Sequence, residues 1–193
     1  MAVPDKTERM NIPNSLTLLR IILVPAIVIL LMQGSFKVAI LVFLISGLTD
    51  VLDGYLARVL HQQTVLGSYL DPIADKALMI SCYVTLAVKK ILPGWLSVVV
   101  ISRDCIILIG VAVLTIMSVS HKIQPAPIGK LTTAVQILTV FVFLVSRAVP
   151  GAIAESFMEG LVWVTAFFTV VSGFYYIMIG VQHINQQQKP RSV

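Results

Sequence analysis

Four aspartates lie close together in the sequence: Asp50, Asp53, Asp71 and Asp75. The members of each pair are three or four residues apart, so each pair shares one face if its segment is helical. Carboxylates brought together in an apolar environment repel one another and lose hydration, and therefore need cations. Because the set contains neither His nor Cys, it favours two Mg²⁺ or Mn²⁺ ions over zinc. Two such ions can clamp the phosphates of a substrate during an in-line displacement.

Small residues and one arginine share the faces of these aspartates. Gly54, Ala57 and Arg58 continue the stripe that begins at Asp50, and Gly67 precedes Asp71 by one helical turn. Small side chains leave room for a ligand near the backbone, although they also let helices pack closely. The pattern indicates a phosphate-containing ligand held between two helices.

The complete pattern is D-x2-D-G-x2-A-R-x8-G-x3-D-x3-D. It resembles the signature of the CDP-alcohol phosphotransferase family at every fixed position, namely Asp50, Asp53, Gly54, Ala57, Arg58, Gly67, Asp71 and Asp75. The resemblance implies transfer of a phosphatidyl group from CDP-diacylglycerol to an alcohol, with release of CMP. It implies that the four aspartates bind two metal ions and that Asp75 also takes the proton of the acceptor hydroxyl. Gly54, Ala57, Arg58 and Gly67 would hold the CDP moiety. A homodimer with its site facing the cytoplasm is also implied.

The segment 12–20 resembles the opening of bacterial phosphatidylglycerophosphate synthases, whose acceptor is glycerol 3-phosphate. Within it, Asn14 and Thr17 are candidates to bind the CDP-lipid, although both types are common where helices begin. Arg20 lies inside an apolar run, where it either snorkels to the interface or reaches an anionic group of the acceptor.

Two later segments also resemble phosphatidylglycerophosphate synthases and supply candidates for the acceptor phosphate. Arg103 can make bidentate contacts with a phosphate, and its alternative is an ion pair with Asp104. Lys130 is the second candidate, with a plain lysine flanking a membrane span as its alternative.

Other features resemble cardiolipin synthases of the mitochondrial type, whose acceptor is phosphatidylglycerol. Asp104 replaces a glutamate, and Thr132 stands where a second lysine is expected. A phosphodiester needs fewer cations than a phosphomonoester dianion, because it carries less negative charge. Phosphatidylglycerol is therefore the alternative acceptor to glycerol 3-phosphate. A membrane transporter with a carboxylate site is a distant alternative, because it would not explain Arg58 or the glycine spacing.

The elements that carry these residues are predicted to be membrane helices. Of the 193 residues, 58% are apolar and 12% are charged, and the mean hydropathy is +0.95, which excludes a soluble globule. We expect an all-α, polytopic protein with six transmembrane helices in one bundle and a single domain, 1–193. The six spans are predicted at 15–33, 38–60, 67–88, 95–118, 128–149 and 157–182. Residues 1–14 are predicted to be a short interfacial segment and 186–193 a disordered tail.

Charges and aromatic residues bear on orientation and partners. Seven Lys and Arg residues flank the spans on the side of the termini and four on the other, which predicts cytoplasmic termini. We expect a bacterial inner-membrane protein that binds the lipid bilayer and no nucleic acid, since its basic residues are scattered.

Four aromatic side chains are predicted to be interface anchors or to face lipid, namely Trp95, Trp163, Tyr175 and Tyr176. Cys82 and Cys105 are predicted to be buried thiols.

Overall fold

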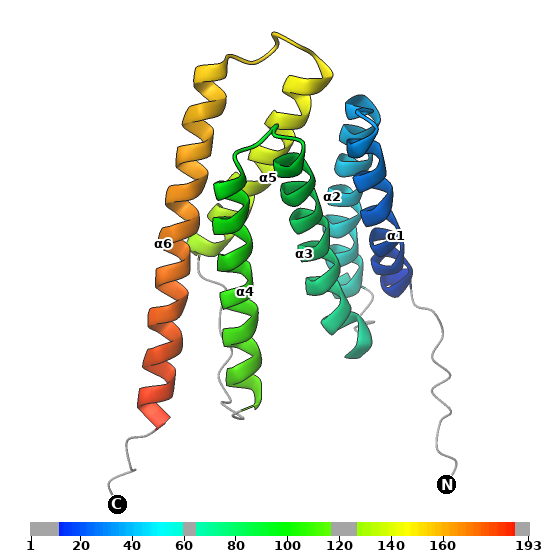
Figure 1. The fold of residues 1–193 in the computed structure, drawn as a ribbon. Helices are drawn as coiled ribbons and strands as arrows, with labels where there is room; N and C mark the ends of the chain where they lie inside the picture. Colours follow the sequence, from blue (N-terminus) through cyan, green and yellow to red (C-terminus); the bar gives the residue numbers. More distant parts are fainter. Residues whose placement is uncertain (1–11, 60–64, 117–126, 188–193) are drawn as a thin grey trace, which may run out of the picture. The chain divides into compact units, whose positions relative to one another are not determined.

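The computed structural model of the protein describes the backbone of residues 12–59, 65–116 and 127–187, and the side chains of residues 19–49, 76–110 and 127–182. The described residues form helices and no strand (Figure 1). The helices are α1 (Ile12–Met32), α2 (Phe36–Val59), α3 (Val65–Val88), α4 (Gly94–Ile116), α5 (Pro127–Ala148) and α6 (Glu155–Gln187). The predicted all-α class and the six predicted helices are confirmed.

Two helix ends differ from the prediction. Helix α1 begins at Ile12, so residues 12–14 belong to it and not to a separate interfacial segment. Residues 1–11 lie outside the described residues. Helix α6 continues to Gln187, beyond the predicted start of the disordered tail at 186. Residues 181–187 contain no Gly or Pro, so none of the usual helix-ending residues stops the helix there.

The chain divides into two compact units, Met1–Lys89 and Lys90–Val193. In the first unit, α1 packs against both α2 and α3. In the second unit, α6 packs against both α4 and α5. Each unit is thus built around one helix that contacts the other two (Figure 1). That all six helices form one bundle stays a prediction.

The end of α1 is fixed by its own backbone and by Lys89, the residue that follows α3. Gly34, with φ at 78°, closes the helix: its N–H donates to Leu31 O and the Ser35 N–H donates to Leu30 O, which is the Schellman arrangement. Lys89 Nζ also donates to Leu31 O at 2.8 Å and to Met32 O at 2.9 Å. A cation from the end of α3 therefore satisfies carbonyls that the end of α1 leaves without helical partners.

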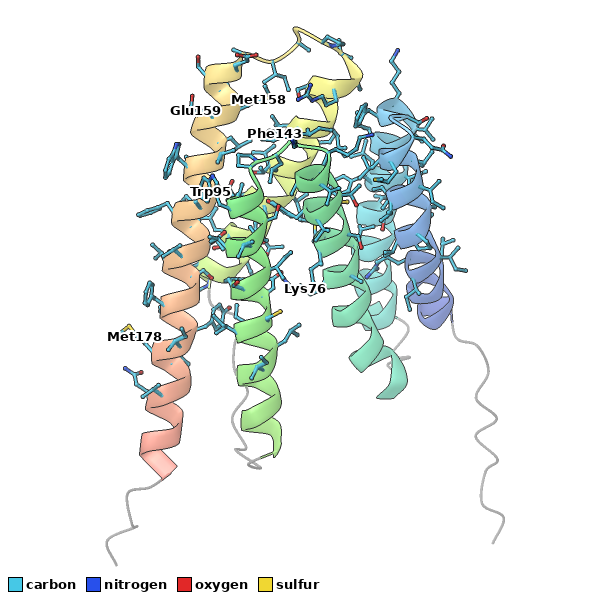
Figure 2. The ribbon with its side chains drawn as sticks, viewed as in Figure 1. Lys76, Trp95, Phe143, Met158, Glu159 and Met178 are labelled. Atoms are coloured by element: carbon cyan, nitrogen blue, oxygen red, sulfur yellow. The ribbon has the colours of Figure 1, made fainter. Side chains whose placement is uncertain are left out.

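Helix α6 places polar side chains inside and large apolar side chains outside. Its buried face includes Thr165, Thr169 and Ser172, whereas Trp163 and Phe174 are about two-thirds exposed. Figure 2 shows Met178, also exposed, pointing away from α4. A protein in water shows the opposite distribution. Within the described residues, Pro127–Ala148 and Glu155–Gln182 are long and apolar enough to cross a membrane. We infer that lipid surrounds the apolar face of α6.

Hydrogen bonds between side chains join α5 to α6. Gln136 Nε2 donates to Thr169 Oγ1 at 3.1 Å, and the hydroxyls of Thr139 and Thr165 are 2.6 Å apart. All four residues are buried. Such bonds hold helices together where the surrounding lipid is as apolar as the helix surfaces. We call these contacts the α5–α6 polar seam.

Two of the sequence interpretations concern aromatic and thiol side chains. Trp95 and Trp163 are both exposed and pack against each other, with ring centroids 5.4 Å apart, in agreement with an exposed aromatic anchor. Cys82 is buried as predicted, whereas Cys105 is exposed. The prediction for Cys105 was wrong because an apolar run does not distinguish the face that packs on other helices from the face that does not.

Candidate functional site

The four aspartates lie on two helices of the first unit. Asp50 and Asp53 lie on α2, and Asp71 and Asp75 lie on α3. Because both segments are helical, the members of each pair share a face, as their spacing predicts. The side chains of residues 50–75 lie outside the described residues, so the proposed roles of the aspartates, Gly54, Ala57, Arg58 and Gly67 stay predictions. The same holds for Asn14 and Thr17, which lie on α1.

A buried serine extends the aspartate stripe of α2 by one turn. Ser46 is 1% exposed, and its Oγ has no hydrogen-bond partner among the described residues. It precedes Asp50 by four residues, so Ser46, Asp50, Asp53 and Ala57 form one stripe. The neighbouring Thr49 hydroxyl, in contrast, donates to Ser46 O at 2.8 Å. A buried hydroxyl without a partner is unfavourable unless a ligand or water reaches it. Sequence analysis missed Ser46, although its spacing was a signal.

Arg20 lies in the same unit and is 1% exposed. Its helix, α1, packs against both helices that carry the aspartates. Burial of a guanidinium favours an electrostatic role within the protein over snorkelling to the membrane surface.

The chemistry of the donor set fits a hard divalent cation. Asp50, Asp53, Asp71 and Asp75 offer oxygen ligands only, which is the type that Mg²⁺ and Mn²⁺ prefer. Among the described side chains, no cluster of three His, Cys, Asp or Glu residues could hold a metal ion. That the four aspartates hold the ions stays a prediction from their chemistry and spacing.

Arg103, on α4 of the second unit, is the best-defined cation of the predicted site residues. Its side chain is buried, and Nη1 lies 2.8 Å from Asp104 Oδ1. Nη2 donates to Ser172 Oγ on α6 at 2.7 Å, while no described residue is a hydrogen-bond partner of Nε. The alternative role predicted for Arg103, an ion pair with Asp104, is thus present in the structure. It leaves a role toward the acceptor open, because a guanidinium has five N–H donors.

Two further contacts hold Arg103 against α6. The methyl group of a Gly173→Ala variant would lie 3.6 Å from Arg103 Cγ, so the side chain passes close to the α6 backbone. The Tyr176 ring centroid lies 5.7 Å from Arg103 Cζ, within the range of a cation–π contact. Tyr176 was predicted to anchor at the interface or to face lipid, and this was wrong: its ring lies against Arg103.

Tyr176 also packs against the first turn of α5. The methyl group of a Gly129→Ala variant would overlap the Tyr176 hydroxyl and lie 3.1 Å from its Cε2. Gly129 is buried, and the next residue, Lys130, is exposed. Sequence analysis missed Ser172 and Tyr176, although Thr165, Thr169, Ser172 and Tyr176 recur at helical spacing in an apolar helix.

Comparison with known proteins places this set of residues in a family. Residues 10–171 match the sequence model of the CDP-alcohol phosphatidyltransferase family. The chain is 33% identical to the CDP-diacylglycerol--glycerol-3-phosphate 3-phosphatidyltransferase of Bacillus subtilis, with 86% of this chain and 93% of that protein covered. It is 32% identical to a probable phosphatidylglycerophosphate synthase of Mycobacterium tuberculosis, with 86% and 80% covered.

A second group of relatives has a different name. The chain is 33% identical to the cardiolipin synthase (CMP-forming) of Rattus norvegicus, with 88% of this chain and 61% of that protein covered. The chain thus spans less than two thirds of the rat protein and nearly all of the Bacillus protein. The names of both groups agree with the family that the motif on α2 and α3 predicts. The region that matches the family model extends through most of the described helices. The chain therefore belongs to the CDP-alcohol phosphatidyltransferase family.

Proposed function

We propose that this protein transfers the phosphatidyl group of CDP-diacylglycerol to the hydroxyl of glycerol 3-phosphate, which gives phosphatidylglycerophosphate and CMP. The observation that carries the proposal is the likeness to the Bacillus subtilis phosphatidyltransferase over 93% of that protein. The intact aspartate motif supports it, because a variant without the motif would lack the residues expected to hold the metal ions.

In the proposed reaction, the acceptor oxygen forms a bond to the phosphorus that carries diacylglycerol. The bond between that phosphorus and the bridging pyrophosphate oxygen breaks, and CMP leaves with this oxygen. Asp75 takes the proton of the acceptor hydroxyl, provided that it lies within hydrogen-bond reach. Gly54, Ala57, Arg58 and Gly67 hold the CDP moiety, with Asn14 and Thr17 beside it.

Two Mg²⁺ or Mn²⁺ ions supply electrostatic stabilisation of the phosphates when bound. The residues that hold them are Asp50, Asp53, Asp71 and Asp75. Buried Arg20 contributes a positive charge to the same unit. Arg103 and Lys130 bind the acceptor phosphate, which an arginine suits because its N–H groups match phosphate oxygens.

Phosphatidylglycerol is the second candidate acceptor, and the surroundings of Arg103 favour it. Asp104 and Ser172 already engage both Nη atoms of Arg103, and Asp104 cancels its charge. A phosphodiester monoanion needs less positive charge than a phosphomonoester dianion. The relatives named cardiolipin synthase are as similar in sequence as the Bacillus enzyme.

An acceptor competition tests the proposal. Purified protein with CDP-diacylglycerol and Mg²⁺ receives glycerol 3-phosphate, phosphatidylglycerol, or both, and the product lipid is identified by mass spectrometry. We expect phosphatidylglycerophosphate and CMP in equal amounts. Cardiolipin as the product would replace the first candidate by the second. No CMP release with either acceptor would contradict both and favour a transport role.

We further propose that the protein is a homodimer in a bacterial inner membrane, with its site open to the cytoplasm. The excess of Lys and Arg on the side of the termini supports this orientation. The apolar outer face of α6 supports insertion in a bilayer.

A further inference from the structure

We propose that Tyr176 is a positioning residue that orients Arg103 for the acceptor phosphate and is itself held in place by Gly129. This inference rests on the proposed function, since it assigns a task to the residue expected to bind the acceptor. It joins three helices of the second unit: Arg103 from α4, Gly129 from α5 and Tyr176 from α6.

The first argument concerns the charge of Arg103. A buried guanidinium with a single carboxylate partner and one hydroxyl partner retains unused N–H donors, and within the described part of the chain Nε has no hydrogen-bond partner. The aromatic face of Tyr176 adds an attraction for the cation without using any of these donors. Tyr176 can thus restrain the guanidinium while leaving donors available for an anion.

The second argument concerns the position of Tyr176. Its ring fits only because residue 129 has no side chain, since an added methyl group would overlap the hydroxyl. Closely packed atoms move little, so the contact fixes the ring relative to the first turn of α5. The same turn carries Lys130, the second candidate for the acceptor phosphate. One aromatic side chain therefore contacts both Arg103 and the residue that precedes Lys130.

The third argument concerns the neighbouring tyrosine. Tyr175 is exposed, with a ring centroid 6.0 Å from that of Tyr176, and no contact of Tyr175 with Arg103 is found among the described residues. Of the two tyrosines, Tyr176 is the one whose described contacts reach α4, through Arg103, and α5, through Gly129. A lipid-facing anchor would not require a glycine opposite its hydroxyl, so the packing distinguishes Tyr176 from an interfacial tyrosine.

Steady-state kinetics of Tyr176 variants test the inference. We expect Tyr176→Leu to raise the KM for the acceptor by about tenfold, the size that loss of a desolvated cation–π contact implies. The KM for CDP-diacylglycerol should stay unchanged, because α2 and α3 carry the motif expected to bind it. Tyr176→Phe keeps the ring and should stay close to wild type. Phe174→Leu removes an exposed ring from the same helix and is the matched control.

A rescue experiment tests the role of Gly129 and does not require Tyr176→Leu to fold. Gly129→Ala should raise the KM for the acceptor, because the Tyr176 hydroxyl must move. Adding Tyr176→Phe removes the overlapping hydroxyl and should recover part of the lost acceptor affinity. If Gly129→Ala acted through Lys130 alone, Tyr176→Phe would give no recovery, and the inference would be wrong.

The outcomes separate this inference from the proposed function. Wild-type turnover with an unchanged acceptor KM in Tyr176→Leu overturns the inference alone. An equal rise of both KM values also overturns it, since this would indicate general loss of structure. The kinetics are measured with whichever acceptor the wild type uses. If the wild type makes cardiolipin, the same variants are therefore tested with phosphatidylglycerol as the acceptor. Absence of CMP release by the wild type overturns both.

Discussion

At the scale of single residues, the proposed chemistry depends on carboxylates whose positions are set by helical spacing. Asp75 is the residue given two tasks, as a metal ligand and as the base. An amide in its place would keep nearly the same volume but would lose both the negative charge and the ability to accept a proton. The resulting loss should therefore concern turnover and not folding.

We predict that Asp75→Asn abolishes CMP release, with a loss of at least about 100-fold, the lower bound for removing a general base. The thermal unfolding midpoint in detergent should stay within a few degrees of wild type. Activity is measured as CMP released from CDP-diacylglycerol. The control is Glu159→Gln, which neutralises an exposed carboxylate at the start of α6 and should retain full activity. Near-wild-type turnover of Asp75→Asn would refute the assignment.

The four aspartates also predict dependence on divalent metal. Chelation with EDTA should stop CMP release, and Mg²⁺ or Mn²⁺ should restore it, whereas Zn²⁺ should not, because the ligands are oxygens only. Metal titration of the chelated protein with an activity readout measures this. Full activity after exhaustive chelation would show that the carboxylates serve another purpose.

At the scale of elements, each unit uses polar contacts to fix the ends and faces of apolar helices. Lys89, which directly follows α3, caps the carbonyls of Leu31 and Met32 at the end of α1. Its Nζ also lies 5.6 Å from the Phe36 ring centroid at the start of α2. A single lysine thus contacts all three helices of the first unit near one end.

We predict that Lys89→Met frees the end of α1. The two carbonyls lose a charged donor, which costs about 1.5–3 kcal/mol of folding free energy for a charge-assisted hydrogen bond. The amides of residues 33–35 should exchange with deuterium faster, because their hydrogen bonds close the same turn. Lys37→Met, at an exposed position, is the control. Unchanged exchange at 33–35 would mean that the Schellman turn holds the helix end without Lys89.

The α5–α6 polar seam predicts a measurable coupling between hydroxyls. A double-mutant cycle of Thr139→Val and Thr165→Val should give a coupling of about 0.6 kcal/mol, the average for hydrogen bonds between membrane helices. The measurement is unfolding in mixed micelles. Thr133 supplies the control, since its hydroxyl donates to Gly129 O in its own helix, so Thr133→Val should not couple to Thr165→Val. Equal coupling in both cycles would contradict a role for the seam.

The number and ends of the helices could be predicted from sequence because long apolar runs alternate with short polar breaks. Which face of each helix packs against other helices could not be predicted in the same way. In a membrane helix both the packed face and the lipid face are apolar, so hydrophobic periodicity does not tell them apart. Tyr176 was for this reason assigned to the wrong face. The aspartate motif could be recognised from sequence because charged residues in an apolar chain are few and their spacing is informative. Ser46 shares that spacing, four residues before Asp50, but it was missed because an uncharged serine is less conspicuous than an aspartate in an apolar helix.

At the scale of the whole molecule, the distribution of charge predicts an orientation. In the predicted six-span topology, seven flanking Lys and Arg residues fall on the side of the termini and four fall on the other. Cytoplasmic loops are the ones enriched in these residues. The site motif would then face the compartment that supplies the water-soluble acceptor glycerol 3-phosphate.

We predict that a reporter enzyme fused after Val193 is active in the cytoplasm, whereas one inserted between α3 and α4, at residues 89–93, is active only on the opposite side. The protein should also stay in the membrane pellet after alkaline extraction. A fusion after Lys122 is the internal control, because the loop at 119–127 is predicted to share the side of the termini. Activity of both the Val193 and the 89–93 reporters on one side would contradict the six-span topology.

The ion pair of α4 has a consequence for how the protein is made. Arg103 and Asp104 are consecutive residues, and their side chains are 2.8 Å apart. Each charge alone would oppose entry of a helix into the bilayer by about 2.5–3.5 kcal/mol on the insertion scale. Because the counter-ion is carried on the same turn, the predicted span α4 would enter the membrane as a nearly neutral segment. It need not wait for the ribosome to finish α6, and Ser172 and Tyr176 can engage the guanidinium after both helices have been inserted.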